Sequence, residues 1–163
     1  MKYTALIVTF NRLGKLKKTV EETLKLEFTN IVIVNNGSTD GTQAWLSSIV
    51  DTRVIVLTLT ENTGGAGGFK TGSQYICTQL ASDWVFFYDD DAYPYPDTLK
   101  SFSQLDKRGC RVFSGLVKDP QGKPCPMNMP FSRVPTSLGD TVRYLRYPAE
   151  FIPAANRSMF VQT

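Results

Sequence analysis

The sequence contains no histidine, and this absence excludes several catalytic and metal-binding arrangements at once. Nucleophilic sites of the Ser/His or Cys/His type, and zinc sites with histidine ligands, all need an imidazole from the chain. The cysteines are few, odd in number and far apart, without a C-x-x-C spacing: Cys77, Cys110 and Cys125. We therefore expect free thiols in a reducing compartment, the cytosol.

Long apolar runs and a strong excess of one charge are also missing. No segment reaches the roughly 18 apolar residues of a membrane span, and the short apolar run that ends at Phe10 fits a strand better than a signal peptide. The net charge is only +3 and the basic residues are scattered, so we expect no nucleic-acid partner. The local group Lys15, Lys17 and Lys18 can favour a phosphate or an anionic surface, but it is more typical of a solvated helix face.

What the chain does contain is an alternation of strand and helix patterns. Its 163 residues, 42% of them hydrophobic, suit one domain with an ordinary core. Strands are predicted at residues 4–10, 31–34, 54–59 and 84–88, and helices at about 13–26, around 44–49 and at about 69–80. The second strand is apolar on both faces, which is typical of a parallel sheet covered by helices. The order predicts an α/β fold, a mostly parallel sheet with helices on both faces.

The pattern is less regular after residue 91. A helix is predicted at 97–105 and a further strand at 111–117, followed by a proline-rich loop at 124–135. Residues 142–147 fit a strand or a short helix, and residues 158–161 fit a last strand.

Three carboxylates, Asp89, Asp90 and Asp91, follow the fourth strand directly. Because side chains alternate along an extended chain, Asp89 and Asp91 can point the same way and Asp90 the other. Two converging carboxylates repel each other unless a cation joins them, and hard oxygen ligands suit Mg²⁺ or Mn²⁺. The pattern predicts a divalent metal held by an Asp-x-Asp pair with a phosphate as its further ligand. The alternative is a solvated acidic turn.

Polar residues also follow the first two strands. Arg12, with Thr9 before it, can meet a nucleotide, since a guanidinium suits phosphate. Asn35, Asn36 and Asp40 can bond to a base edge or to ribose hydroxyls. The alternatives are a surface residue at a helix start for Arg12 and a plain Asx turn with a helix cap for the second group.

A glycine-rich stretch, which includes Asn62, Gly64 and Gly65, follows the third strand. It lacks the Lys-Ser or Lys-Thr of a P-loop, and it does not follow the first strand as a dinucleotide fingerprint does. In isolation it fits a flexible surface loop, but its place at a strand end beside a carboxylate pair favours close approach to a ligand.

Together, the segments at residues 9–12, 35–42, 62–69 and 89–91 resemble those of glycosyltransferase family 2 in order and spacing. Each segment alone is a weak signal, and four in order are a strong one. The third segment and the triple aspartate most resemble the branch with galactofuranosyltransferases and rhamnosyltransferases. The resemblance covers residues 4–118 well and the remainder loosely.

The resemblance implies a Rossmann-like GT-A fold, a nucleotide-sugar donor and a divalent cation, Mg²⁺ or Mn²⁺. Asn36 stands where the family usually has an aspartate near the nucleobase, so the sequence departs from the family there. The residues expected at the metal are Asp89 and Asp91. Those expected at the donor are Thr9, Arg12, Asn35, Asn36, Asp40, Asn62, Gly64, Gly65, Asp89 and Asp90.

The function that the resemblance implies is that of an inverting glycosyltransferase of cell-surface polysaccharide synthesis. It would transfer sugar from a UDP-galactofuranose-like or dTDP-rhamnose-like donor to a glycan or lipid-linked acceptor, in the cytoplasm and at the inner membrane face. The family's catalytic base lies beyond the segment that corresponds to 158–161, and we expect it beyond Thr163. We thus expect one truncated domain, with a nucleotide-binding half at 1–91 and the start of an acceptor half at 92–163.

Two other functions stay open on the sequence. One is a non-catalytic nucleotide-sugar-binding or assembly module, in which an unmatched strand edge would favour a homodimer. The other is a nucleotidyltransferase, which would need a glycine-rich basic loop directly after the first strand. Here that position holds only residues 11–14, so the nucleotidyltransferase is the weaker of the two.

Overall fold

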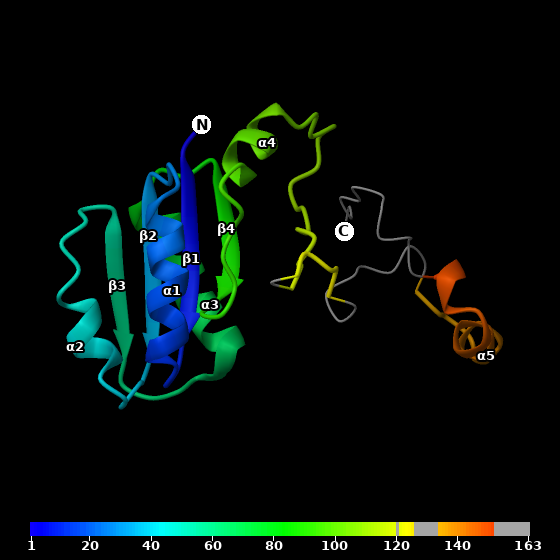
Figure 1. The fold of residues 1–163 in the computed structure, drawn as a ribbon, viewed down its shortest axis with the longest axis horizontal. Helices are drawn as coiled ribbons and strands as arrows, with labels where there is room; N and C mark the ends of the chain where they lie inside the picture. Colours follow the sequence, from blue (N-terminus) through cyan, green and yellow to red (C-terminus); the bar gives the residue numbers. More distant parts are fainter. Residues whose placement is uncertain (120, 126–133, 152–163) are drawn as a thin grey trace. The chain divides into compact units, whose positions relative to one another are not determined.

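The computed structural model describes residues 1–119, 121–125 and 134–151. The chain divides into two compact units, Met1–Leu105 and Asp106–Thr163. The first unit holds a four-stranded sheet in the order β3-β2-β1-β4 (Figure 1). All its strand pairs are parallel, as the sequence predicts, and the strands are β1 (Tyr3–Thr9), β2 (Asn30–Asn36), β3 (Val54–Leu59) and β4 (Trp84–Asp89).

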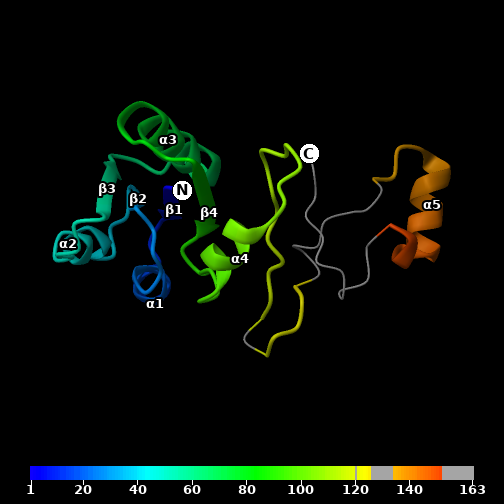
Figure 2. The ribbon, with the colours of Figure 1, turned by 90° about the horizontal axis from the view of Figure 1, so that it is seen from above.

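Helices cover both faces of this sheet, which confirms the predicted α/β fold. Seen from above, α3 (Gly64–Gln79) lies on one side of the strands and α1 (Leu13–Leu24) on the other (Figure 2). The short helices α2 (Thr42–Leu46) and α4 (Thr98–Gln104) contribute Leu46 and Leu99 to the core on the α1 side.

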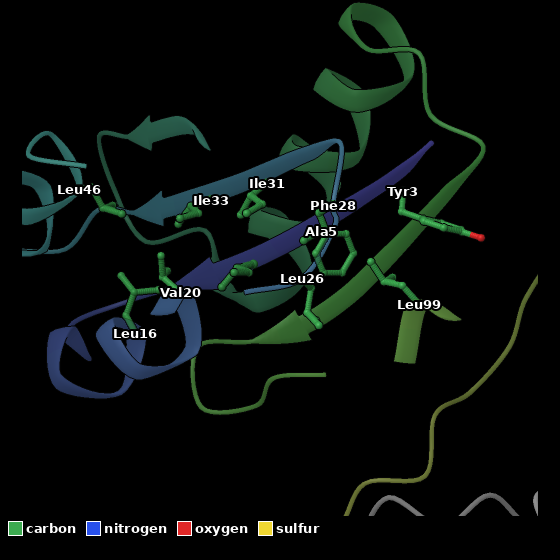
Figure 3. Packing of buried hydrophobic residues seen from close by; sticks show 11 residues of the cluster. Tyr3, Ala5, Leu16, Val20, Leu26, Phe28, Ile31, Ile33, Leu46 and Leu99 are labelled. Carbon is green, nitrogen blue, oxygen red and sulfur yellow. The ribbon is translucent and has the colours of Figure 1, made fainter. Parts of the chain in front are cut away.

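Because side chains point alternately to the two faces of the sheet, the core consists of two hydrophobic clusters, one on each face. Ala5 and Ile7 of β1 face α1 and pack with Leu16 and Val20 in the cluster shown in Figure 3. Leu6 and Val8 belong to the second cluster, with Val32, Val34 and Ile76 of α3. Because β1 and β2 bury both faces, they form the rigid centre from which the loops at their carboxyl ends project.

The glycine-rich stretch differs most from the sequence prediction. It forms the first turns of α3, which begins at Gly64 and not near residue 69. The reason lies in the packing: a Cβ at Gly68 would overlap Val8, and one at Gly72 would overlap Leu6. Glycine is unfavourable in an isolated helix, but here it lets the helix backbone approach the sheet.

The predicted strand at 111–117 is not formed. Only Lys118 and Pro124 nearby make an isolated antiparallel bridge, and Val112 stays 56% exposed. A β-branched, apolar segment becomes a strand only where it finds a neighbour to pair with, and residues 111–117 find none among the described residues.

The second unit contains one α-helix among its described residues, α5 (Leu138–Arg146), followed by the 3₁₀ turn η2 (Pro148–Glu150). Its N-cap is Ser137, whose Oγ accepts a hydrogen bond from the Asp140 N–H at 3.0 Å, so residues 142–147 are mostly helical. The last predicted strand, 158–161, and most of the proline-rich loop lie outside the described residues. In the ranges that are described, no helix has both the length and the apolar character to cross a bilayer.

Candidate functional site

The candidate site lies at the carboxyl edge of the sheet. Since all four strands are parallel, the loops that follow them open on the same edge, where the arrowheads in Figure 1 end. The four segments singled out by the sequence are therefore brought together. They form two layers, one buried and one exposed, and this division was not visible in the sequence.

Asp90 belongs to the buried layer. Its residue is only 4% exposed, and its carboxylate accepts a hydrogen bond from Thr9 Oγ1 at 2.7 Å. Thr19 Oγ1 of α1 donates to the Asp90 backbone carbonyl at 2.9 Å. Asp90 and Thr9 therefore fasten the end of β4 to β1 and α1, and neither side chain is open to a ligand.

Asp91 is exposed and forms ion pairs with two cationic side chains. Arg12 Nη1 and Lys15 Nζ each lie 3.0 Å from Asp91 Oδ2. The hydrogen bond from Lys15 and the positive charges of Lys15 and Arg12 lower the pKa of the Asp91 carboxyl. Arg12 Nη1 also lies 3.5 Å from Asp90 Oδ1, so one guanidinium spans two of the three carboxylates.

Asp89 ends β4 and is exposed, with no hydrogen bond or ion pair to its carboxylate among the described residues. Partial burial raises the pKa of Asp89, the negative charges of Asp91 and Asp90 raise it further, and Arg12 acts in the opposite sense. Negative charge is thus in excess at this end of β4. Such an excess, carried by oxygen donors, suits a hard divalent cation.

The described residues alone do not form a full set of metal ligands. Among residues 1–119, 121–125 and 134–151, no three or more His, Cys, Asp or Glu side chains are arranged to hold a metal ion. The protein offers Asp89 and Asp91 as a pair, and any further ligands would have to come from a bound molecule or water. This is compatible with a metal held jointly with a phosphate.

Asn36 is the centre of a second buried group. Its Nδ2 donates to Asn62 Oδ1 and to the Gly64 carbonyl, both at 3.0 Å. Its Oδ1 accepts from Thr63 N–H and Thr63 Oγ1, also at 3.0 Å. Asn36 is 2% exposed, and both the nitrogen and the oxygen of its amide make hydrogen bonds within the protein. Asn36 therefore stabilises the turn into α3.

Asn35 is equally covered, at 1% exposed. Its Nδ2 donates to Gln43 Oε1 at 2.9 Å, and its Oδ1 accepts from the Ser38 N–H at 3.1 Å. Gln43 Oε1 also accepts from Thr58 Oγ1 at 2.6 Å, which links α2 to β3. Asn35 thus holds the β2–α2 loop in place.

Asp40 is exposed but joins two loops. Its Oδ2 accepts the Leu13 N–H at 3.0 Å at the start of α1, and its Oδ1 accepts Thr42 Oγ1 at 2.6 Å. These hydrogen bonds, the one from Thr42 first, lower the pKa of Asp40. Asn11 adds a second link, since its Oδ1 accepts the Thr39 N–H at 2.7 Å.

The exposed layer holds the remaining predicted residues. Gly64 and Gly65 open α3, and a Cβ at either would have nothing within 4 Å, so this end of the helix is uncovered. The exposed predicted residues are Arg12, Asp40, Asn62, Gly64, Gly65, Asp89 and Asp91. Sequence reasoning missed Lys15 as a neighbour of Asp91, although it placed Lys15 in a basic group that can favour a phosphate; its position one turn after Arg12 was a further signal.

Comparison with known proteins shows the family and the fold. The model of the family described as glycosyl transferase family 2 matches residues 4–157. No curated protein is a significant match to the sequence.

Two solved structures share the fold. A mannosyltransferase, PcManGT from Pyrobaculum calidifontis in complex with GDP-Man and Mn²⁺, matches with a TM-score of 0.60 and 22% identity over 74% of this chain. S. aureus TarS 1-349 in complex with UDP-GlcNAc matches with a TM-score of 0.56 and 20% identity over 72% of this chain. The matches cover 36% and 40% of those two chains, so this chain spans well under half of either. At these identities the likeness establishes the fold.

Proposed function

We propose that this chain, which belongs to glycosyl transferase family 2, binds a nucleotide-sugar donor and forms the donor-binding part of an inverting glycosyltransferase. The observation that carries the proposal is the exposed charge cluster at the end of β4. There, Asp89 and Asp91 lie next to Arg12, at the same edge of the sheet on which the uncovered start of α3 at Gly64 opens. A metal-chelated diphosphate needs carboxylates for the metal and cationic or N–H donors for phosphate oxygens.

We assign Asp89 and Asp91 as the protein's ligands to Mg²⁺ or Mn²⁺, because their oxygens are exposed and share the charge excess of the cluster. The cation would supply Lewis-acid stabilisation of the departing diphosphate. Arg12 would bind phosphate through its guanidinium, and the Gly65 N–H in the first turn of α3 would face the same oxygens, whereas the Gly64 N–H donates to Asn62 Oδ1 at 2.8 Å.

The buried residues take a supporting role in this proposal. Thr9 and Asp90 fix the start of the acidic turn, and Asn35 and Asn36 fix the loops beside it. The donor would therefore be contacted by the exposed residues, among them Asp40 and Asn62.

The donor class is proposed from the third segment and the triple aspartate, which resemble the galactofuranosyl and rhamnosyl branch. This favours a UDP- or dTDP-linked sugar, and a glycan or lipid-linked acceptor of cell-surface polysaccharide synthesis at the cytoplasmic membrane face. We place the nucleotide-binding half at 1–91 and the start of the acceptor half at 92–163. Concentration-dependent sedimentation would test whether the chain forms the homodimer expected of an open strand edge.

Calorimetric titration of UDP, dTDP and GDP, each with and without Mn²⁺, tests the proposal and identifies the base. We expect one nucleoside diphosphate to bind best and to require the metal. Absence of binding by all three in both conditions would contradict the proposal.

Turnover separates an enzyme from a binding module. Release of nucleoside diphosphate from a nucleotide sugar would show catalysis by the chain itself, whereas tight binding without release would favour a non-catalytic module. A nucleotidyltransferase receives no support, because α1 begins at Leu13, only four residues after the end of β1 at Thr9.

A further inference from the structure

Lys15 contacts the candidate metal ligand Asp91 although it belongs to a different part of the chain. It is the third residue of α1, and its Nζ lies 3.0 Å from Asp91 Oδ2. The two neighbouring lysines face elsewhere: Lys17 Nζ is 6.0 Å from the centroid of the Trp45 ring, and Lys18 Nζ is 5.4 Å from that of Tyr93. The basic group on α1 is therefore not one uniform solvated face.

The position of Lys15 does not favour the helix itself. A cation in the first turn opposes the helix dipole, and this first turn contains no acidic residue. The ion pair with Asp91 is favourable for Lys15, and it offsets the unfavourable interaction of the Lys15 charge with the helix dipole.

Lys15 has fewer acidic contacts than Arg12, the other cation on Asp91. Arg12 is held by Asp91 at 3.0 Å and by Asp90 at 3.5 Å, whereas the described residues give Lys15 one acidic partner, Asp91. The Lys15 side chain is 58% exposed. An ammonium on a flexible four-carbon stem can exchange acceptors without any backbone movement.

The charges of the cluster make such an exchange favourable. Asp89, Asp90 and Asp91 carry three negative charges against the two positive charges of Arg12 and Lys15. A divalent cation at Asp91 would turn this small negative balance into a positive one and repel the ammonium from that carboxylate. A diphosphate arriving with the cation would offer Lys15 new acceptor oxygens within reach of its stem.

We propose that Lys15 is an exchangeable cation: it neutralises Asp91 in the free protein and moves to the donor diphosphate when metal and nucleotide bind. Lys15 is thereby a donor-positioning residue with opposite effects on two ligands. It competes with the metal for Asp91 in the absence of nucleotide, and it adds affinity for the nucleotide once the metal is bound. This inference rests on the proposed function, since it assumes that Asp91 binds the metal.

The test compares Lys15→Met with wild type in two titrations. Binding of Mn²⁺ alone is followed by the loss of the electron paramagnetic resonance signal of free Mn²⁺. Because exposed ion pairs contribute up to about 1 kcal/mol, we expect Mn²⁺ to bind about two- to fivefold more tightly to Lys15→Met. Binding of UDP at saturating Mn²⁺ is followed by calorimetry, and the lost charged hydrogen bond should weaken it about tenfold.

Two variants serve as controls. Lys17→Met removes the same charge from the same helix away from Asp91, so both affinities should equal those of wild type. Lys15→Arg keeps the charge and should stay close to wild type for Mn²⁺. Both lysines are exposed, so thermal melts of all variants should coincide.

Each outcome decides the matter. Tighter Mn²⁺ binding together with weaker UDP binding supports the exchange. Unchanged Mn²⁺ binding, or tighter Mn²⁺ binding with unchanged UDP binding, overturns it while leaving the proposed function intact. If wild type and Lys15→Met bind neither Mn²⁺ nor UDP, the proposed function itself fails.

Discussion

At the scale of single residues, the site depends on side chains that a ligand would not touch. Asn36 is the clearest case, because its buried amide donates two hydrogen bonds and accepts two, and these four hold the turn from β3 into α3. The sequence shows an amide where the family usually has an aspartate, and it predicts a place for this residue in the donor site. It does not show that the amide is already saturated, because that depends on how a loop 26 residues further along the chain folds back.

Replacing Asn36 by alanine should therefore destabilise the fold. The change leaves the Thr63 and Asn62 groups without their partner, and we expect the free energy of unfolding to fall by about 2 kcal/mol. Urea denaturation measures it, with Asn62→Ala as the matched control. Asn62 is exposed, so its replacement should cost less than half as much, and equal losses would contradict the assignment.

The Asp51–Arg53 pair gives a pH-dependent prediction. Hydrogen bonds from Arg53 lower the pKa of Asp51 from 3.8 to about 2, while the Arg53 guanidinium also donates to the Leu24 and Leu26 carbonyls at the end of α1. Because the folded-state pKa lies below the unfolded one, the stabilisation is present above about pH 4 and is lost as the pH falls through about 2.

Urea midpoints of wild type and Asp51→Asn should thus differ at neutral pH and converge as the pH falls from about 4 to about 2. A difference that stays constant over this range would show that the ionised carboxylate of Asp51 contributes nothing.

At the scale of elements, the helix–sheet contact of α3 explains its glycines. Gly68 and Gly72 face Val8 and Leu6 of β1, so the helix lies close to the sheet and its N-terminus reaches the site. The sequence identified a need for close backbone approach, but it indicated a ligand as the reason. For Gly68 and Gly72 the reason is the sheet, and only Gly64 and Gly65 stay uncovered.

Gly72→Ala and Gly65→Ala should have opposite effects on stability. A methyl group at Gly72 would overlap the buried Leu6, and we expect a loss of about 1–3 kcal/mol. At Gly65 the space is open, so alanine should stabilise the helix by up to about 1 kcal/mol. Differential scanning calorimetry of both variants is the measurement, and a stabilised Gly72→Ala would refute this packing argument.

The elements that the sequence predicted well are those with strong periodic patterns. All four strands of the sheet and α1 lie within one or two residues of their predicted bounds, because their apolar faces are buried against one another. The prediction of a strand at residues 111–117 was wrong, because strand formation requires a neighbouring strand that the local sequence does not specify.

At the scale of the whole molecule, the two compact units differ in what they contain. Both hydrophobic clusters and every exposed site residue belong to Met1–Leu105. The predicted nucleotide-binding half is 1–91, and the compact unit that contains it continues to Leu105, because Leu99 and Phe102 of α4 pack in the first cluster.

A fragment that ends at Leu105 should consequently fold cooperatively and bind UDP with Mn²⁺ as the full chain does. A fragment that ends at residue 91 lacks α4 and should be less stable. Urea denaturation and calorimetry of both fragments test this, and loss of UDP binding in the longer fragment would place part of the donor site in the second unit.

The central claim is that Asp91 joins a divalent cation to a nucleoside diphosphate. Its most direct test is calorimetric titration of UDP into Asp91→Asn, with Asp97→Asn as control. Asp97 is an exposed residue before α4, where asparagine is an equally good N-cap. With Mn²⁺, we predict that Asp91→Asn binds UDP at least about tenfold more weakly than wild type and the control. Without Mn²⁺, it should bind UDP as well as wild type or better, since a repelling carboxylate is gone. Equal UDP affinity of Asp91→Asn and wild type in Mn²⁺ would contradict the account.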